Sequence, residues 1–159
     1  MKKDIFLEIG VEEIPASYML PALRQLEEAT QKFLNDNEVS FSRIKTLGTP
    51  RRLVLFIEGT EAKTKDGIIE AGKLSGFFSK AIPSISFPKS MRWNVFNIRF
   101  ARPIRWALAL YGSDVINFEL DGVKSGNVSY GHRFLSPEKF AVADFNQYLS
   151  ELKNRFVVI

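Results

Sequence analysis

Strand-length apolar runs alternate with helix-spaced apolar residues along this chain, and that mixture restricts the fold to architectures that combine sheet and helix. Residues 5–10 form a short apolar run that ends at a glycine, which is typical of a strand. Between Met19 and Phe33 the apolar side chains recur at three- and four-residue steps, the spacing of one helix face. Pro15 and Pro21 lie near the start of this segment, where a helix tolerates proline.

The next segment predicts a hairpin and a second helix. Residues 41–47 and 53–58 have strand patterns, and Gly48-Thr49-Pro50 between them supplies turn residues. After a polar connection, the apolar residues within 68–82 favour an amphipathic helix that ends at Pro83.

The remainder of the chain is predicted to be β-rich with a terminal helix. Ile104–Tyr111 is a long apolar run whose pattern leaves helix and strand both open. Val115–Leu120 and Val128–Phe134 are expected strands, and Asp144 is a suitable N-cap for a helix over 145–154. The chain as a whole therefore predicts an α+β fold with a largely antiparallel β-sheet and two to three packed helices.

Several classes of function are excluded by what the sequence lacks. There is no cysteine, which excludes disulfides, thiolate metal sites and thiol catalysis. No apolar run approaches the roughly 20 residues of a membrane-spanning helix, and we expect a cytoplasmic protein with no membrane contact. Neither GxxxxGK(S/T) nor GxGxxG occurs, so no phosphate-binding loop is predicted. His132 is the single histidine, which favours a hydrogen-bonded structural role or a phosphate contact over a zinc site or catalysis.

Glu8, Glu12 and Glu13 form the one candidate cluster of carboxylates. Paired carboxylates can serve as general acid and base or bind Mg²⁺. The simpler interpretation is structural, because Glu12 and Glu13 would lie just before a helix and favour its positive end. We favour the structural interpretation and predict neither a catalytic residue nor a metal site in this chain.

The positive charge of the chain is concentrated in one segment. The formal net charge is only +4, yet residues 71–113 contain no acidic residue and carry seven Lys or Arg. Clustered cations favour a polyanionic partner because they release counterions from phosphates. The alternative is that these cations pair with acids of the flanking segments, and charge alone does not separate the two interpretations.

Arginine alternates with aromatic residues in Phe87–Trp93 and in Arg99–Trp106. Arginine makes bidentate phosphate contacts, and aromatic rings can stack on unpaired bases. The aromatic residues of this region and its surroundings are expected to pack against the sheet instead of stacking on bases; they are Trp93, Trp106, Phe100 and Phe134.

Two adjacent arginines follow the turn of the expected hairpin. Neighbouring side chains of a strand point to opposite faces, so one of Arg51 and Arg52 could bind phosphate while the other pairs with an acid. The predicted basic face comprises Lys89, Arg92, Arg99, Arg102 and Arg105, and it is extended by Arg51, Arg52, Lys124 and Arg133.

Five motifs spread along the chain carry a resemblance to a known family. They are FLEIGVEEIP at 6–15, GTPRRL at 48–53, FPKSMRW at 87–93, RFARPIRW at 99–106 and GHRF at 131–134. In this order they resemble the motifs of bacterial tetrameric glycyl-tRNA synthetase β subunits, which usually open with LEIGTEEIP.

The resemblance implies a role in a multi-subunit enzyme. In that family the α subunit carries the class II active site, and with it the ATP and Mg²⁺ of the reaction. The β subunit is needed for tRNA binding and for the assembled enzyme. The implied partners are the α subunit, the remainder of the β subunit and tRNA(Gly). This chain alone is expected to be inactive and to hold no cofactor.

The resemblance also implies a boundary within the chain. The family usually has a longer stretch before the motif at 87–93, so an inserted subdomain is expected to be missing here. Within 1–159 we distinguish a strand–helix–hairpin part at 1–60, a shortened connection at 61–86 and a β-rich part with a terminal helix at 87–159. The apolar run at 156–159 suggests a fragment, and the HD-like and anticodon-binding regions of the family lie beyond it.

A protein-interaction scaffold is the main alternative to a tRNA-binding segment. On that interpretation the same face docks the α subunit or the rest of the β subunit and makes no tRNA contact. Salt separates the two, because phosphate binding weakens steeply with salt and an apolar docking face does not. An independent hydrolase that uses Glu12, Glu13 and His132 has little support from the residues.

Overall fold

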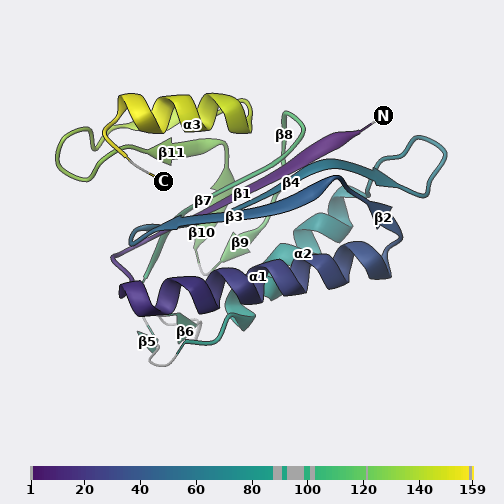
Figure 1. Ribbon diagram of the computed structural model, residues 1–159, viewed down its shortest axis with the longest axis horizontal. Helices are drawn as coiled ribbons and strands as arrows, with labels where there is room; N and C mark the ends of the chain where they lie inside the picture. The colour runs from purple at the N-terminus through teal and green to yellow at the C-terminus, as the bar shows by residue number, and fades with distance from the viewer. Residues whose placement is uncertain (1, 88–90, 93–98, 101–102, 121, 158) are drawn as a thin grey trace.

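The protein is an α+β fold in which helices cover both faces of one mixed, largely antiparallel sheet. A computed structural model describes all residues except 1, 88–90, 93–98, 101–102, 121 and 158 (Figure 1). The helices in the described part are α1 (Ala16–Asp36), α2 (Ala71–Ser84) and α3 (Phe145–Asn154). The strands of the sheet are β1 (Lys3–Val11), β2 (Val39–Ser40), β3 (Arg43–Thr49), β4 (Arg52–Ala62), β7 (Ile104–Tyr111), β8 (Asp114–Val115), β9 (Glu119–Leu120) and β10 (Val123–Gly126).

Two short pairs of strands lie outside the sheet. They are β5 (Met91–Arg92) with β6 (Arg99–Phe100), and β11 (Val128–Tyr130) with β12 (Lys139–Ala141), both antiparallel. Along the main sheet the order is β2-β4-β1-β7-β10-β9, with β3 paired to β4 and β8 to β7. The β7–β10 pairing is the parallel one among the described pairings, which makes the sheet mixed.

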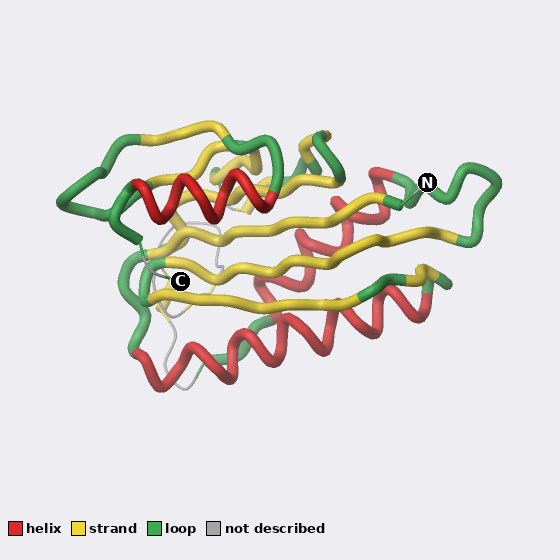
Figure 2. The backbone as a smooth tube through the Cα atoms, turned by 45° about the horizontal axis from the view of Figure 1, so that its top comes forward, coloured by secondary structure: helices red, strands yellow, loops and turns green. Residues whose placement is uncertain are grey.

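The central strand β1 is buried on both faces because helices lie on both sides of it. Alternate residues of β1 point to opposite faces. Ile5, Leu7 and Ile9 belong to the core beneath α1 and α2, whereas Phe6 belongs to the core beneath α3. Figure 2 shows this layered arrangement, with the strands between the two groups of helices. By the same alternation, Glu8 faces α3.

The helix predictions are confirmed, with changed boundaries. α1 buries the stripe that contains Leu23 and Leu26 and continues through Pro21 in its first turns. α2 begins at Ala71 and includes Pro83, so the prediction that the helix spans 68–82 is wrong at both ends. α3 has the predicted range, and Asp144 caps it by accepting a hydrogen bond from the Gln147 backbone N–H at 2.8 Å.

The strand predictions are confirmed in the first half and corrected in the second. β3 and β4 form the expected hairpin. Ile104–Tyr111, for which the sequence pattern allowed either helix or strand, is a strand. The predicted strand Val115–Leu120 is interrupted, because the Ser125 hydroxyl accepts from the Phe118 N–H at 2.8 Å and donates to the Ile116 carbonyl at 2.7 Å. These side-chain bonds satisfy backbone groups that a regular ladder would otherwise use.

The predicted strand Val128–Phe134 ends early, at Tyr130. The chain then turns, and the Ser136 N–H donates to the His132 carbonyl at 3.0 Å. The resulting loop lies at the same end of the sheet as the β3–β4 turn and the end of α3 (Figure 1). None of the described helices is long and apolar enough to cross a bilayer.

Candidate functional site

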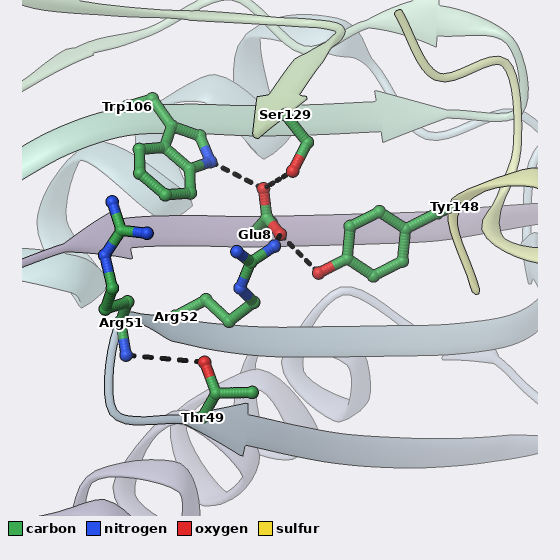
Figure 3. A network of polar contacts seen from close by, with 7 residues as sticks. All are labelled: Glu8, Thr49, Arg51, Arg52, Trp106, Ser129 and Tyr148. Atoms are coloured by element: carbon green, nitrogen blue, oxygen red, sulfur yellow. Dashed lines mark hydrogen bonds and ion pairs between the residues drawn. The ribbon is translucent and has the colours of Figure 1, made fainter. Parts of the chain in front are cut away.

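A buried carboxylate is the centre of the polar network shown in Figure 3. Glu8 of β1 is 0% exposed. Its Oε1 accepts hydrogen bonds from Trp106 Nε1 at 2.6 Å and from Ser129 Oγ at 2.6 Å. Its Oε2 accepts from Arg52 Nη1 at 3.1 Å and from the Tyr148 hydroxyl. The four donors come from β7, β11, β4 and α3, so one side chain connects the main sheet, the β11–β12 pair and α3.

This network is a buried ion pair with neutral donors around it. The side chains of Arg52 and Glu8 are 2% and 0% exposed. Taking two charges out of water is unfavourable unless hydrogen bonds satisfy the remaining lone pairs and protons. The Trp106, Ser129 and Tyr148 donors supply those bonds to the carboxylate. Glu8 is therefore fully engaged as a structural centre, which agrees with the structural interpretation of this residue.

The phenol of Tyr148 is held in its neutral form. Burial, and after it the nearby Glu8 carboxylate, raises the pKa of Tyr148 well above its ordinary value. A neutral phenol keeps the proton that it donates to Glu8. Glu8 adds to the effect of burial, because a phenolate beside its carboxylate would place two anions in one buried site.

The other two candidate carboxylates have arginine partners. Glu12 accepts from Arg105 Nε at 2.6 Å. Glu13 lies 3.9 Å from Arg133 Nη1, and both side chains are about half exposed or more, at 66% and 48%. The carboxylates of Glu8, Glu12 and Glu13 therefore have three separate sets of partners. No group of three or more His, Cys, Asp or Glu that could hold a metal ion occurs among the described residues.

Three neighbouring pockets lie beside this network at one end of the sheet. The turn pocket, of about 340 Å³, is lined by Glu13, Thr49, Pro50, Arg51, Arg52, His132, Arg133, Phe134, Phe156 and Val157. The Glu12 pocket, of about 310 Å³, is lined by Glu12, Arg51, Arg105, Trp106, Tyr130, Gly131, Arg133 and Pro137. The Lys124 pocket, of about 380 Å³, is lined by Arg105, Trp106, Ala107, Gly122, Val123, Lys124, Gly126, Val128 and Tyr130.

Shared lining residues make the three pockets one continuous surface. Arg51 and Arg133 line both the turn pocket and the Glu12 pocket. Arg105 lines both the Glu12 pocket and the Lys124 pocket. Cationic side chains therefore connect each pocket to the next, and we call Arg51, Arg105, Lys124 and Arg133 together the basic surface.

Arg51 is partly buried and lies near two other arginines. Burial, followed by the nearby cations of Arg52 and Arg133, lowers the pKa of Arg51, and Glu12 and Glu13 act in the opposite direction. An arginine nevertheless stays protonated, so Arg51 presents a cation to the pockets that it lines. The guanidinium lies over the Trp106 ring, with 5.8 Å between its carbon and the ring centroid. This cation–π contact orients Arg51 along the wall of the pockets.

The structure brings together four of the nine predicted basic residues and separates one. Arg51, Arg105, Lys124 and Arg133 line the connected pockets. Arg52 is 1% exposed and its charge is paired with Glu8, so it cannot extend an accessible basic face as expected. The sequence allowed one of the adjacent arginines to pair with an acid, and Arg52 does so. Arg51 precedes β4 and lines the turn pocket and the Glu12 pocket. Lys89 and Arg102, and the side chains of Arg92 and Arg99, lie outside the described residues.

The expectation for the aromatic residues is confirmed for two and wrong for one. Trp106 is 7% exposed and Phe100 is 0% exposed, so both pack as predicted. Phe134 is 77% exposed and lies on the surface, because the strand expected to bury it ends at Tyr130. Trp93 lies outside the described residues.

His132 has the expected hydrogen-bonded role. Its Nδ1 accepts from the backbone N–H groups of Phe134 and Leu135, each at 3.1 Å. Sequence reasoning missed Ser129, Tyr148 and Phe156 as parts of this region. A glutamate inside an apolar strand was the available signal for a buried polar centre, but no local pattern identified the donors that reach Glu8 from other elements.

The fold and the site together define an α+β protein with a buried ionic centre and a pocketed basic surface beside it. The family model of the glycyl-tRNA synthetase beta subunit matches residues 5–73 and 67–159. The chain belongs to the glycyl-tRNA synthetase beta subunit family.

Curated relatives support the same assignment. The glycine–tRNA ligase beta subunit of Syntrophus aciditrophicus is 33% identical over 215 residues, which cover 100% of this chain and 31% of that protein. The beta subunits of Syntrophomonas wolfei, 32% identical over 100% of the chain, and Geobacter sulfurreducens, 32% identical over 99%, each match across 31% of their own length. The chain thus spans about 31% of the length of these relatives. The alignment with the Syntrophus aciditrophicus protein is longer than the 159 residues of this chain.

Proposed function

We propose that this chain is the part of glycine–tRNA ligase that contributes to tRNA(Gly) binding and to subunit assembly, and that it carries out no chemical step of aminoacylation. Its partners on this proposal are the α subunit, the remainder of the β subunit and tRNA(Gly), in the cytoplasm. ATP and Mg²⁺ serve the α subunit, and this chain alone is inactive.

The observation that carries the proposal is the basic surface. Arg51, Arg105, Lys124 and Arg133 line three connected pockets at one end of the sheet. Arginine and lysine on such a surface bind phosphates and release their counterions. A surface that has pockets as well as charge favours a folded or single-stranded RNA over a uniform polyanion. Unstacked bases of such an RNA can enter recesses in the protein.

The engagement of the candidate acids supports a non-catalytic role. Glu8 accepts hydrogen bonds from four donors and is closed to solvent. Glu12 and Glu13 each face an arginine. A general acid or base must reach the proton of a substrate, and a carboxylate that is buried and saturated does not.

Binding of the purified chain to tRNA(Gly) at two salt concentrations tests the proposal. The variant Arg105→Gln/Lys124→Gln/Arg133→Gln removes three cations of the basic surface. The control Lys32→Gln/Arg43→Gln/Lys63→Gln removes three cations that line none of the three pockets. We expect steep salt dependence for the wild type and the control. For the first variant, the slope of log binding constant against log salt concentration should become shallower by roughly 0.7–0.9 for each phosphate contact that is lost. Equal binding by both variants would reject the basic surface as the tRNA site.

A scaffold without tRNA contact is the second candidate, and exposed apolar residues favour it. Phe134, Leu135 and Phe156 are 77%, 64% and 60% exposed. Exposed apolar residues that lie together mark docking sites for proteins. If the chain binds the α subunit with little salt dependence and does not bind tRNA(Gly) at low salt, the scaffold replaces the proposal.

A further inference from the structure

We propose that the turn pocket binds one unpaired nucleotide of an RNA, with its phosphate against Arg51 and Arg133 and its base against Phe134 and Phe156. This inference rests on the proposed function and adds which chemical unit of the nucleic acid the pocket takes. It differs from a general basic surface because it requires an aromatic wall as well as a cationic one.

The cationic wall contains a donor that is not yet used. Nε of Arg51 finds no acceptor within the described part of the chain. Buried donors without a partner are rare, because leaving one unsatisfied is unfavourable. Arg51 lines the turn pocket, whereas the charge of Arg52 is paired with Glu8. A phosphate oxygen is an acceptor that an arginine binds with good geometry.

Arg133 is available to an anion for a different reason. Its contact with Glu13 spans 3.9 Å between exposed side chains. Surface ion pairs of this kind contribute little stability. A phosphate that enters the pocket can therefore replace the Glu13 contact at small cost, and Arg133 can turn from Glu13 to it.

His132 adds a donor of fixed identity to the pocket. Because its Nδ1 accepts from the Phe134 and Leu135 backbone N–H groups, the proton of the neutral ring lies on Nε2. The ring of His132 is thereby a donor on its Nε2 side. The same two hydrogen bonds hold the loop that carries Phe134, so the aromatic wall is positioned before any ligand arrives.

The aromatic wall is maintained against local backbone preference. Phe156 follows α3 with a φ of 64°, in the left-handed region. The Val157 N–H donates to the Leu152 carbonyl at 2.9 Å and the Phe156 N–H to the Lys153 carbonyl at 3.3 Å, the pattern in which glycine usually occupies that position. A phenylalanine there is strained, and yet 60% of it is exposed. The core does not need this ring, whereas a base would stack on it.

The size of the pocket fits one nucleotide. Its volume of about 340 Å³ lies at the small end of the range of roughly 300–1,000 Å³ for ligand pockets. A paired base within a duplex keeps its faces stacked and cannot enter such a recess. The pocket should therefore distinguish single-stranded from double-stranded RNA.

The test compares a fluorescent six-nucleotide single-stranded RNA with a blunt RNA duplex, using the whole chain and measuring anisotropy. Phe156→Gly is the main variant, because it relieves the left-handed strain while removing the ring. Leu20→Ala is the matched control, since Leu20 is 71% exposed on α1 and lines none of the three pockets. Phe134→Ala tests the second ring of the wall.

We expect Phe156→Gly to bind the single strand roughly 5- to 150-fold more weakly, the range for loss of one base–aromatic stack. Its thermal midpoint should be equal to or above that of the wild type, and Leu20→Ala should bind like the wild type. Single-strand binding that is unchanged in both Phe156→Gly and Phe134→Ala overturns the inference. So does loss of α-subunit binding in these variants without any effect on RNA, which would assign the rings to protein docking.

Two further outcomes separate this inference from the proposed function. Steep, salt-dependent tRNA(Gly) binding together with no single-strand binding would overturn the nucleotide pocket and leave the tRNA role standing. Single-strand binding that responds to Phe156→Gly, in a chain that does not bind tRNA(Gly), would support the pocket and reject the tRNA role. If neither tRNA(Gly) nor the single-stranded RNA binds at low salt, the nucleotide pocket and the tRNA role are both overturned.

Discussion

Arg52 of β4 donates from Nη1 to Oε2 of Glu8 in β1 over 3.1 Å, on a diagonal across the strand pairing. The register places Arg52 opposite Gly10 and Glu8 opposite Val54, so the ion pair spans two residues on one face. On the other side of β1, Gly10 lies opposite Trp106, and the absence of a side chain at Gly10 leaves room for the indole. The buried pair and the indole therefore share one compact site.

Removing the charge of Glu8 should be strongly destabilising. In Glu8→Gln the Arg52 cation stays buried without its charged partner. The NH₂ group of the glutamine also faces groups that donate hydrogen bonds to Glu8 in the wild type. We expect the free energy of unfolding to fall by about 3–5 kcal/mol, measured by urea denaturation and circular dichroism. Glu12→Gln, at a half-buried surface pair, should change it by less than about 1 kcal/mol. A loss of similar size in both variants would contradict the central role of Glu8.

Tyr148 should give the protein a specific sensitivity to high pH. Its folded pKa is raised, so the unfolded chain releases the phenol proton first as pH rises. The stabilisation is complete below the unfolded pKa of about 10 and is lost as pH rises from there through the folded pKa. Tyr148→Phe should be less stable at pH 7 by about 1.5–3 kcal/mol through the lost hydrogen bond to a charged group.

The difference between wild type and Tyr148→Phe should then narrow above pH 10, measured by urea unfolding at several pH values. Tyr18→Phe is the matched control and should follow the wild-type curve. A constant difference between wild type and Tyr148→Phe from pH 7 to 11 would show that the phenol does not titrate differently in the two states.

Gly10 should not tolerate a methyl group. A Cβ at this position would overlap the indole ring of Trp106. We expect Gly10→Ala to lower the free energy of unfolding by about 1–3 kcal/mol through overpacking, and to displace the indole from Glu8. Gly72→Ala is the control, because nothing lies within 4 Å of its added Cβ and alanine favours the helix by about 0.5–1 kcal/mol. Parallel thermal melts compare the two variants, and the thermal midpoint should fall in Gly10→Ala and rise in Gly72→Ala. Equal midpoints in the two variants would contradict the prediction.

The cap of α3 should contribute a modest, isolated amount of stability. Asp144→Ala removes the acceptor for the Gln147 N–H and should lower the free energy of unfolding by about 1 kcal/mol. Asp144→Asn retains a side-chain acceptor and should lose only a few tenths. Chemical denaturation of the two variants side by side measures the difference, and a large loss in Asp144→Asn would indicate that the charge matters more than the acceptor.

Glu12 should moderate the basic surface. Its carboxylate accepts from Arg105 Nε at 2.6 Å, which neutralises one cation of that surface. On the proposed function, Glu12→Gln frees Arg105 for phosphate, so tRNA(Gly) should bind more tightly and the salt slope should steepen by about one unit. Glu138→Gln, an exposed acid that lines none of the three pockets, is the charge-matched control. Unchanged binding in Glu12→Gln would remove Arg105 from the tRNA site.

Local patterns predicted much of the fold because the relevant forces act over a few residues. The apolar stripe that contains Leu23 and Leu26 specified α1, and the capping chemistry of Asp144 specified the start of α3. The same patterns failed where a distant group replaced a backbone partner. Ser125 ended the strand expected at Val115–Leu120 by bonding to its backbone from seven and nine residues away.

By itself, the sequence determined the α+β class, the places of the three helices and the motifs of the family, because each rests on spacing along the chain. Only the tertiary structure decided the roles of the adjacent arginines. Pairing of β1 with β4 buried Arg52 against Glu8, whereas Arg51 was left facing the pockets. Burial and charge pairing depend on which strands become neighbours, and residues 44, 98, 121 and 140 positions apart became partners of one carboxylate for that reason.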